Sequence, residues 1–132
     1  MKIEELSVGN FLFFTDGDCA VCVQEIYNDA QLLISDGDSI SEPVHITHLR
    51  PIPLTPEILE KNGLMRVTEE KGYEAYCCND FLIRRSKFSC TDWWQVDVHY
   101  KQYVAHLSGY IQYVHQLQRL LTINECDKEI EL

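Results

Sequence analysis

Four cysteines stand in two close pairs, a pattern that invites comparison with a metal site. Cys19 and Cys22 are separated by two residues, and Cys77 and Cys78 are adjacent. A structural zinc site needs ligands that converge on the ion, and cysteine pairs usually do so from a turn. The flanking residues predict strands, on which side chains three apart or adjacent point to opposite faces. We therefore expect no metal and no cofactor, and we interpret these thiols as small apolar core residues.

The five histidines form no motif that indicates catalysis. His45 and His48 lie on one predicted strand and face opposite sides, and His99, His106 and His115 are scattered among aromatic residues. The chain has no nucleophile elbow, phosphate-binding loop or dinucleotide-binding motif. We expect no catalytic residue and no enzymatic activity. An unrecognised enzyme stays an alternative, because a triad is defined by geometry in space and not by sequence order.

Cationic and large aromatic residues are interleaved at a single place in the chain. Arg84, Arg85 and Lys87 are followed by Trp93 and Trp94. Such a cluster can anchor a protein partner or stack on the bases of a single-stranded nucleic acid. Adjacent strand residues face opposite sides, so we expect one tryptophan in the core and the other at the surface. We predict these five as partner-binding residues, the alternative being a core tryptophan beside solvated or stacked arginines.

The charge of the chain is strongly acidic and unevenly distributed. The 132 residues carry a formal net charge of −10, and residues 1–54 hold nine acidic side chains against Lys2 and Arg50, a net of −7. A phosphate backbone favours lysine and arginine, so this field opposes general nucleic-acid binding, above all by the first half. Most acids of this half lie in predicted turns, where exposure is the ordinary explanation. We expect a protein partner instead of a nucleic acid.

The chain reads as cytoplasmic. Six cysteines would suit the disulfide framework of an exported protein. Residues 1–5, however, carry two acids where an export signal has a basic and then an apolar region. No apolar run approaches the ~18 residues that span a bilayer, and no lipidation motif is present. We expect reduced thiols and no membrane contact.

Residues 1–50 are predicted to form short strands separated by tight turns. Apolar runs indicate strands at 8–14, 19–26, 31–35 and 44–49, and Asp-Gly-Asp turns occupy 16–18 and 36–38. Four or five short strands within about fifty residues favour a small, half-open SH3-like β-barrel.

A proline-rich connector and a short helix occupy residues 51–63. Three prolines at 51, 53 and 56 favour an extended segment outside any central strand or helix interior. Thr55 is a good N-cap, and Pro56 suits the first helical position. Gly63 can end the helix in the left-handed conformation, with Leu64 placed to contact Leu59.

Residues 64–132 are predicted to form an antiparallel sheet covered by a C-terminal helix. Strands are indicated at 64–68, 73–77, 81–85 and 93–98, with a further strand at 101–107. A helix is expected from residue 108 or 109 to 122, with a buried stripe at Tyr110, Val114, Leu117 and Leu121. The acidic residues 124–132 are expected to be a partly ordered tail.

Two segments carry a resemblance to a family of small proteins of gut Bacteroidales, their phages and mobile elements. They are the connector with its helix, Arg50-Pro51-Ile52-Pro53-Leu54-Thr55 onward, and the string Tyr113-Val114-His115-Gln116-Leu117-Gln118. The chain resembles this family over nearly its whole length and departs from it at residues 123–128, where a short glycine-containing turn is usual. The resemblance implies a phage or mobile-element origin and no particular activity.

Together these features predict an α+β fold in three parts. Residues 1–50 form the SH3-like barrel, 51–63 the connector and short helix, and 64–132 the sheet with its helix. The expected function is that of a non-enzymatic protein-binding or adaptor protein. A sharper variant is an acidic inhibitor that imitates nucleic-acid charge towards a host factor, and a nucleic-acid-binding module is the competing class.

Overall fold

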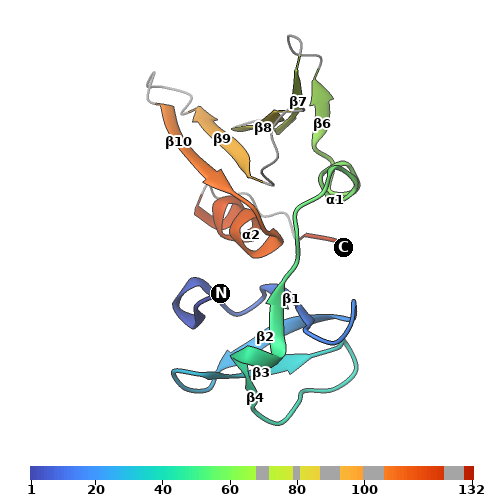
Figure 1. The fold of residues 1–132 in the computed structure, drawn as a ribbon, viewed down its shortest axis with the longest axis vertical. Coiled ribbons are helices and arrows are strands. Elements are labelled where there is room, and N and C mark those ends of the chain that lie inside the picture. The colour runs from blue at the N-terminus through green and yellow to red at the C-terminus, as the bar shows by residue number, and fades with distance from the viewer. Residues whose placement is uncertain (68–71, 79–80, 87–92, 100–105, 124–129) are drawn as a thin grey trace. The chain divides into compact units, whose positions relative to one another are not determined.

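The chain folds into two compact units, each built on one sheet (Figure 1). The computed structural model describes residues 1–67, 72–78, 81–86, 93–99, 106–123 and 130–132. One unit comprises Met1–Pro53 with Tyr113–Gln118, and the other comprises Leu54–Gln112 with Arg119–Leu132. Each contains a five-stranded antiparallel sheet, and the described residues form two α-helices. The predicted α+β class is confirmed.

The N-terminal sheet has the strand order β4-β3-β2-β1-β5. Its strands are β1 (Phe11–Phe14), β2 (Ala20–Ile26), β3 (Gln31–Ser35), β4 (Val44–His45) and β5 (Leu49–Pro51), with short 3-10 helices η1 (Ile3–Glu5) and η2 (Ile46–His48). The single strand predicted at 44–49 is wrong, because η2 interrupts it. His45 Nδ1 accepts the Thr47 backbone N–H at 3.2 Å and caps this turn. Within residues 1–67, which are all described, no pairing joins β4 to β5, so the sheet is not closed.

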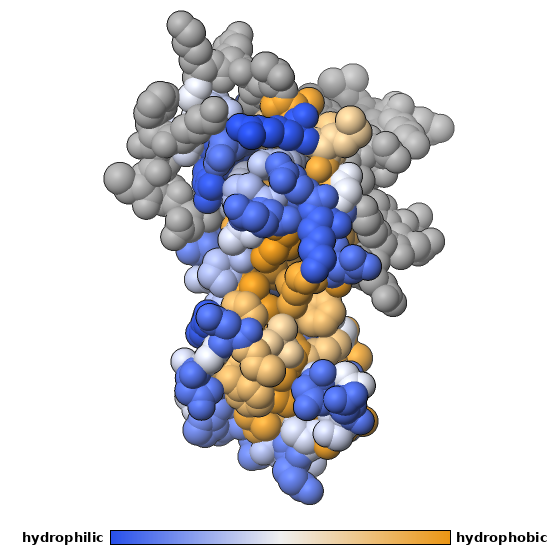
Figure 2. Space-filling view, turned by 90° about the vertical axis from the view of Figure 1, so that its right-hand side faces the viewer, coloured by the Kyte–Doolittle hydropathy of each residue, from blue (hydrophilic) through white to orange (hydrophobic). Residues whose placement is uncertain are grey.

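Strand alternation gives this sheet two apolar faces. One face forms the core of the unit, where seven side chains are buried: Leu6, Leu12, Val21, Val23, Leu32, Ile34 and Leu49. The opposite face carries five half-buried residues, named here the N-terminal apolar face: Phe11, Phe13, Ala20, Cys22 and Leu33. The space-filling view shows an apolar area on this unit, flanked by hydrophilic residues (Figure 2).

The connector begins as an edge strand. Pro51 pairs with Leu12 in β1, a position where a missing N–H is tolerated. The Ile52 carbonyl then accepts the Val114 N–H at 2.9 Å, and the Leu54 N–H donates to the Gln112 carbonyl at 3.0 Å. These two bonds belong to different units, so the boundary lies between Pro53 and Leu54, inside the segment predicted as a connector.

The helix α1 (Pro56–Lys61) has the predicted boundaries. The Thr55 hydroxyl accepts the Ile58 N–H at 3.3 Å, and Pro56 opens the first turn. Gly63 has φ 81°, and the Leu64 N–H donates to the Leu59 carbonyl at 3.1 Å. This bond closes a Schellman motif around a buried Leu59.

Both ends of α1 give a test of stability. Thr55→Ala removes the N-cap acceptor, and Gly63→Ala places a Cβ on a left-handed residue, so each should lower the free energy of unfolding by about 1 kcal/mol. Urea denaturation measures both effects. Glu57→Gln, which keeps the cap, is the control and should change stability by less than about 0.5 kcal/mol.

The C-terminal sheet is the predicted antiparallel meander, in the order β10-β9-β8-β7-β6. Its strands are β6 (Met65–Val67), β7 (Tyr73–Cys78), β8 (Phe81–Ser86), β9 (Trp94–His99) and β10 (His106–Ile111). Residues 108–111, predicted as the start of a helix, pair in register with β9, from Ser108 opposite Asp97 to Ile111 opposite Trp94. The helix prediction is wrong there, because cross-strand pairing replaces the helical hydrogen bonds.

The helix α2 (Val114–Ile123) is shared between the two units. Gln116 Oε1 accepts the Tyr113 N–H at 3.0 Å and caps the helix start. The side-chain amide of Gln118 binds β1, accepting the Phe11 N–H at 3.0 Å and donating to the Gly9 carbonyl at 2.9 Å. The first part of α2 therefore belongs with the N-terminal sheet, and only the part from Arg119 onward belongs with the sheet that the whole helix was predicted to cover.

Residues Ile130–Leu132 are docked on α1. Ile130 is buried, and the buried Asn62 side chain binds the Glu131 backbone twice. Its Nδ2 donates to the Glu131 carbonyl and its Oδ1 accepts the Glu131 N–H, each at 2.6 Å. Lys61 Nζ also donates to the Leu132 carbonyl. The part of the predicted tail that the structure describes is thus fixed by specific bonds.

Candidate functional site

The described cysteines do not converge. Cys19 is exposed just before β2, which corrects its predicted core position, because the strand begins one residue later. Cys22 and Cys77 are half-buried on sheets of different units. Burial raises the pKa of the Cys22 thiol, so it is protonated at neutral pH. Cys90 and Cys126 lie outside the described residues, as do the side-chain surroundings of Cys78.

The histidines lie in three places: His45 and His48 at η2, His99 opposite His106 on β9 and β10, and His115 in α2. His45 and His48 are exposed at η2, and the side chains of His99 and His106 are not among those described. Among the described residues, no group of three or more histidine, cysteine, aspartate or glutamate side chains could hold a metal ion. His115 is 1% exposed in α2, and neither ring nitrogen has a hydrogen-bond partner. Its ring stacks on Tyr113 with 5.8 Å between centroids.

The buried His115 gives a pH test. Burial lowers its pKa from the ordinary 6.5, and the nearby Glu5 opposes this only in part. The folded state thus favours the neutral ring, whereas the unfolded chain takes up a proton near pH 6.5. The folded state therefore has its full stability above pH 6.5 and loses stability as the pH decreases below that value. We expect the free energy of unfolding to decrease from pH 7.5 to 5.5. His115→Leu should flatten this decrease in urea titrations, whereas the control His48→Ala should keep it.

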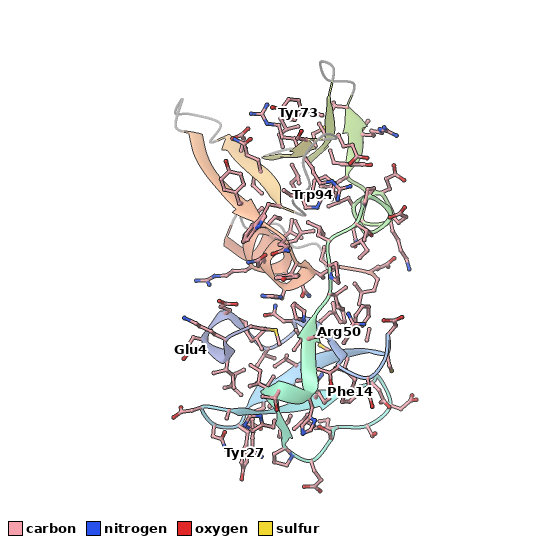
Figure 3. All side chains as sticks on the ribbon, viewed as in Figure 1. Glu4, Phe14, Tyr27, Arg50, Tyr73 and Trp94 are labelled. Carbon is pink, nitrogen blue, oxygen red and sulfur yellow. The ribbon has the colours of Figure 1, made fainter. Side chains whose placement is uncertain are left out.

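Trp94 and Arg85 form a structural cluster on the core side of the C-terminal sheet. Trp94, labelled in Figure 3, is fully buried. Its indole N–H donates to the Leu54 carbonyl at 3.2 Å. The Arg85 guanidinium lies 4.3 Å from the Trp94 ring centroid and binds Glu74 at 2.8 Å. Tyr76 meets the indole edge-on at 6.0 Å. Trp94 therefore has no surface for a partner, and its predicted contact role is corrected to a structural one.

Arg84 lies on the other face of this sheet, and Trp93 lies directly before β9. Arg84 is half-buried, with its guanidinium 5.4 Å from the Tyr73 ring, and its Nε donates to Gln95 Oε1 at 3.3 Å. Trp93 is 46% exposed directly before β9, whereas Trp94 is 0% exposed. The predicted division of the two tryptophans between surface and core is confirmed. Lys87, the remaining predicted contact residue, lies outside the described residues.

Register places further residues on the Arg84 side of the sheet, among them the buried Ala75 directly opposite Arg84. Arg84 is opposite Gln95, and Gln95 is opposite Tyr110. Met65 is opposite Cys77 on the same side. We name this surface the open face, formed by Met65, Tyr73, Arg84, Gln95, Asp97 and Tyr110 with Trp93 at its border. Met65, Tyr73, Trp93 and Tyr110 are all exposed.

The sequence prediction missed Tyr73, Tyr110 and Met65 as members of this surface. Strand alternation was the signal for Tyr73: it lies two residues before Ala75 on β7, so the two share one face of the sheet, and Tyr76 lies on the other face. Tyr110 was predicted to lie in a helix, so its cross-strand pairing with Gln95 was not predicted. To predict the open face, one must know the order of the five strands in the sheet, which residue types alone do not specify.

Comparison with known protein families, curated proteins and solved structures gives no match for this chain. Within the described residues, no helix has the length and apolar character needed to cross a membrane.

Proposed function

We propose that this chain is a non-enzymatic protein-binding protein that contacts its partner through the open face. The observation that carries this proposal is that exposed Tyr73 and Tyr110 lie on the same side of a sheet as Arg84, with exposed Trp93 directly before β9. Tyrosine, tryptophan, methionine and arginine are enriched in protein interfaces and provide most hot spots. The contact of Arg84 with Tyr73 and Gln95 holds its side chain in place, which lowers the entropy lost on binding.

A single-stranded nucleic acid is the second candidate, because exposed aromatic rings on a sheet can stack on bases. The chain charge of −10 opposes it, and Arg84 is itself 3.9 Å from the Asp97 carboxylate. We expect no mobility shift of single- or double-stranded DNA at about 50 mM salt, where phosphate contacts are strong. Salt-sensitive micromolar binding to single strands that Arg84→Ala abolishes would favour the nucleic-acid function. Arg84→Ala is the suitable variant, since Arg85→Ala would also disturb Trp94.

The N-terminal unit is proposed to be a half-open SH3-like barrel. Five short antiparallel strands, with β1 between β2 and β5, support this assignment. With the open face on the other unit, the chain would act as an adaptor in the cytoplasm. Its resemblance supports a phage or mobile-element origin, and its acidity is compatible with inhibition of a host factor that binds nucleic acid.

The proposal is tested by affinity capture from a nuclease-treated lysate of a gut Bacteroidales bacterium, the source that the resemblance indicates. Tyr110 on the open face and Tyr27 in the turn after β2 are both exposed, at 66% and 56%. We expect a protein that wild type and Tyr27→Ala retain and Tyr110→Ala loses. A set of captured proteins that is the same for all three forms would contradict the proposal.

A further inference from the structure

The N-terminal apolar face is unusual because its sheet already has a buried core on the other side. Phe11 is opposite Cys22 and Phe13 is opposite Ala20, with Leu33 on the next strand. All five residues are half-buried. Antiparallel sheets with one solvated face usually carry polar residues there. A surface of aromatic and aliphatic side chains of this kind marks an interaction site.

Charged groups border this face. The Arg50 guanidinium lies 4.6 Å from the Phe13 ring centroid and binds Asp18 at 2.5 Å. Exposed Glu25 is directly opposite Leu33. The Asp18 and Glu25 carboxylates therefore lie beside this apolar surface, and Asp18 already pairs with Arg50.

We infer that the N-terminal apolar face docks an amphipathic segment of a partner protein that carries lysine or arginine beside its apolar residues. Charge complementarity selects this occupant, since residues 1–54 have a net charge of −7 and Arg50 is already paired. A second copy of the chain would bring the same negative charge to the contact. An anionic membrane surface would be repelled for the same reason. The inference goes beyond the open face and can fail independently of it.

A synthetic peptide tests the inference directly. The probe is a helical peptide of about 18 residues with leucine on one face and lysine on the other. Two controls are a peptide with glutamate in place of each lysine and a peptide with serine in place of each leucine. Isothermal titration calorimetry of the full chain should show binding of the lysine–leucine peptide only, at about 150 mM salt, where distant charges are screened.

Matched charge variants locate the binding site. Glu25→Lys changes the charge beside the apolar face, whereas Glu4→Lys makes the same change in η1, whose Ile3 packs on the core side. Glu25→Lys should weaken peptide binding at least about fivefold and Glu4→Lys less than about twofold. Leu33→Ser should also weaken it at least about fivefold, with circular dichroism to show that the fold is kept.

Several results would overturn the inference. Equal effects of Glu25→Lys and Glu4→Lys would mean that binding follows the overall charge and not this face. Binding of the glutamate peptide would show that positive charge on the peptide is not required. Binding of the serine peptide would show that apolar contact is not required. Concentration-dependent dimers that Leu33→Ser disperses would assign the face to a second copy, and cosedimentation with phosphatidylserine vesicles would assign it to a membrane. Open-face variants such as Tyr110→Ala should leave peptide binding unchanged.

Discussion

Trp94→Ala should lower the free energy of unfolding by about 4 kcal/mol, the largest effect expected for a single substitution in this chain. The indole is fully buried and its N–H donates to the Leu54 carbonyl. Its loss leaves a cavity beside Tyr76 and leaves the Arg85 guanidinium without its aromatic partner. Urea denaturation followed by circular dichroism measures the change without relying on tryptophan fluorescence.

Trp93→Ala is the matched control, because it removes the same side chain one residue earlier. Trp93 is 46% exposed, so its loss should lower stability by less than about 1 kcal/mol. Trp94→Phe keeps most of the ring volume and removes the N–H donor, and should fall between the two alanine variants. Equal destabilisation by both alanine substitutions would contradict the assignment of Trp94 to the core and Trp93 to the surface.

Asn62→Ala should lower the free energy of unfolding by about 3 kcal/mol. Asn62 is 2% exposed, and its amide binds the Ile58 carbonyl at 2.7 Å as well as the Glu131 N–H and carbonyl. In Asn62→Ala these three backbone groups lose their hydrogen bond to the Asn62 side chain. Ile130 then also loses the bonds that hold the next residue, Glu131, against α1. Asn62→Asp should be at least as severe, because a carboxylate cannot donate to the two carbonyls.

The control for Asn62 is Glu131→Ala. Asn62 contacts only the backbone of Glu131, whose side chain is exposed, so this substitution should change stability by less than about 0.5 kcal/mol. Hydrogen exchange should show faster exchange of the Glu131 amide in Asn62→Ala and not in Glu131→Ala. If Asn62→Ala leaves both stability and this exchange rate unchanged, the docking of Ile130–Leu132 on α1 is wrong.

The sequence was most informative where structure is determined by neighbouring residues. All the signals for α1 lie between Leu54 and Leu64: an N-cap residue, a proline at the first turn and a glycine after the last turn. In the structure this glycine has φ 81°. These interactions form within one or two turns of the chain, so residue types are enough to predict them. The same holds for the alternation of Trp93 and Trp94, although the sequence did not say which of the two is buried.

The errors lie where pairing partners decide the structure. Tyr110 and Ile111 fit a helical stripe with Val114 equally well as a strand, and only β9 opposite them makes them β10. The strand predicted at 44–49 divides because Leu49 pairs with Phe14 while His45 pairs with Gln31. Residues 1–50 thus consist of short antiparallel strands as predicted, with one break that the prediction missed.

The open face was predicted only in part. Arg84 and Trp93 were identified from their composition, and both are at the open face. Arg85 and Trp94 came from the same run of sequence but point to the core, because neighbouring strand residues alternate. Tyr73 and Tyr110 join Arg84 through the pairing of β7, β8, β9 and β10, and no local pattern contains that information.

The most direct test of the proposed function is the dissociation constant of a purified captured partner for three forms of the chain. We expect wild type and Tyr27→Ala to bind with the same affinity within about twofold, and Tyr110→Ala to bind at least about tenfold more weakly, a loss of about 1.4 kcal/mol or more. Both tyrosines are exposed, so their removal should leave the fold intact. Equal affinity of all three forms, or weaker binding by Tyr27→Ala alone, would show that the partner does not contact the open face.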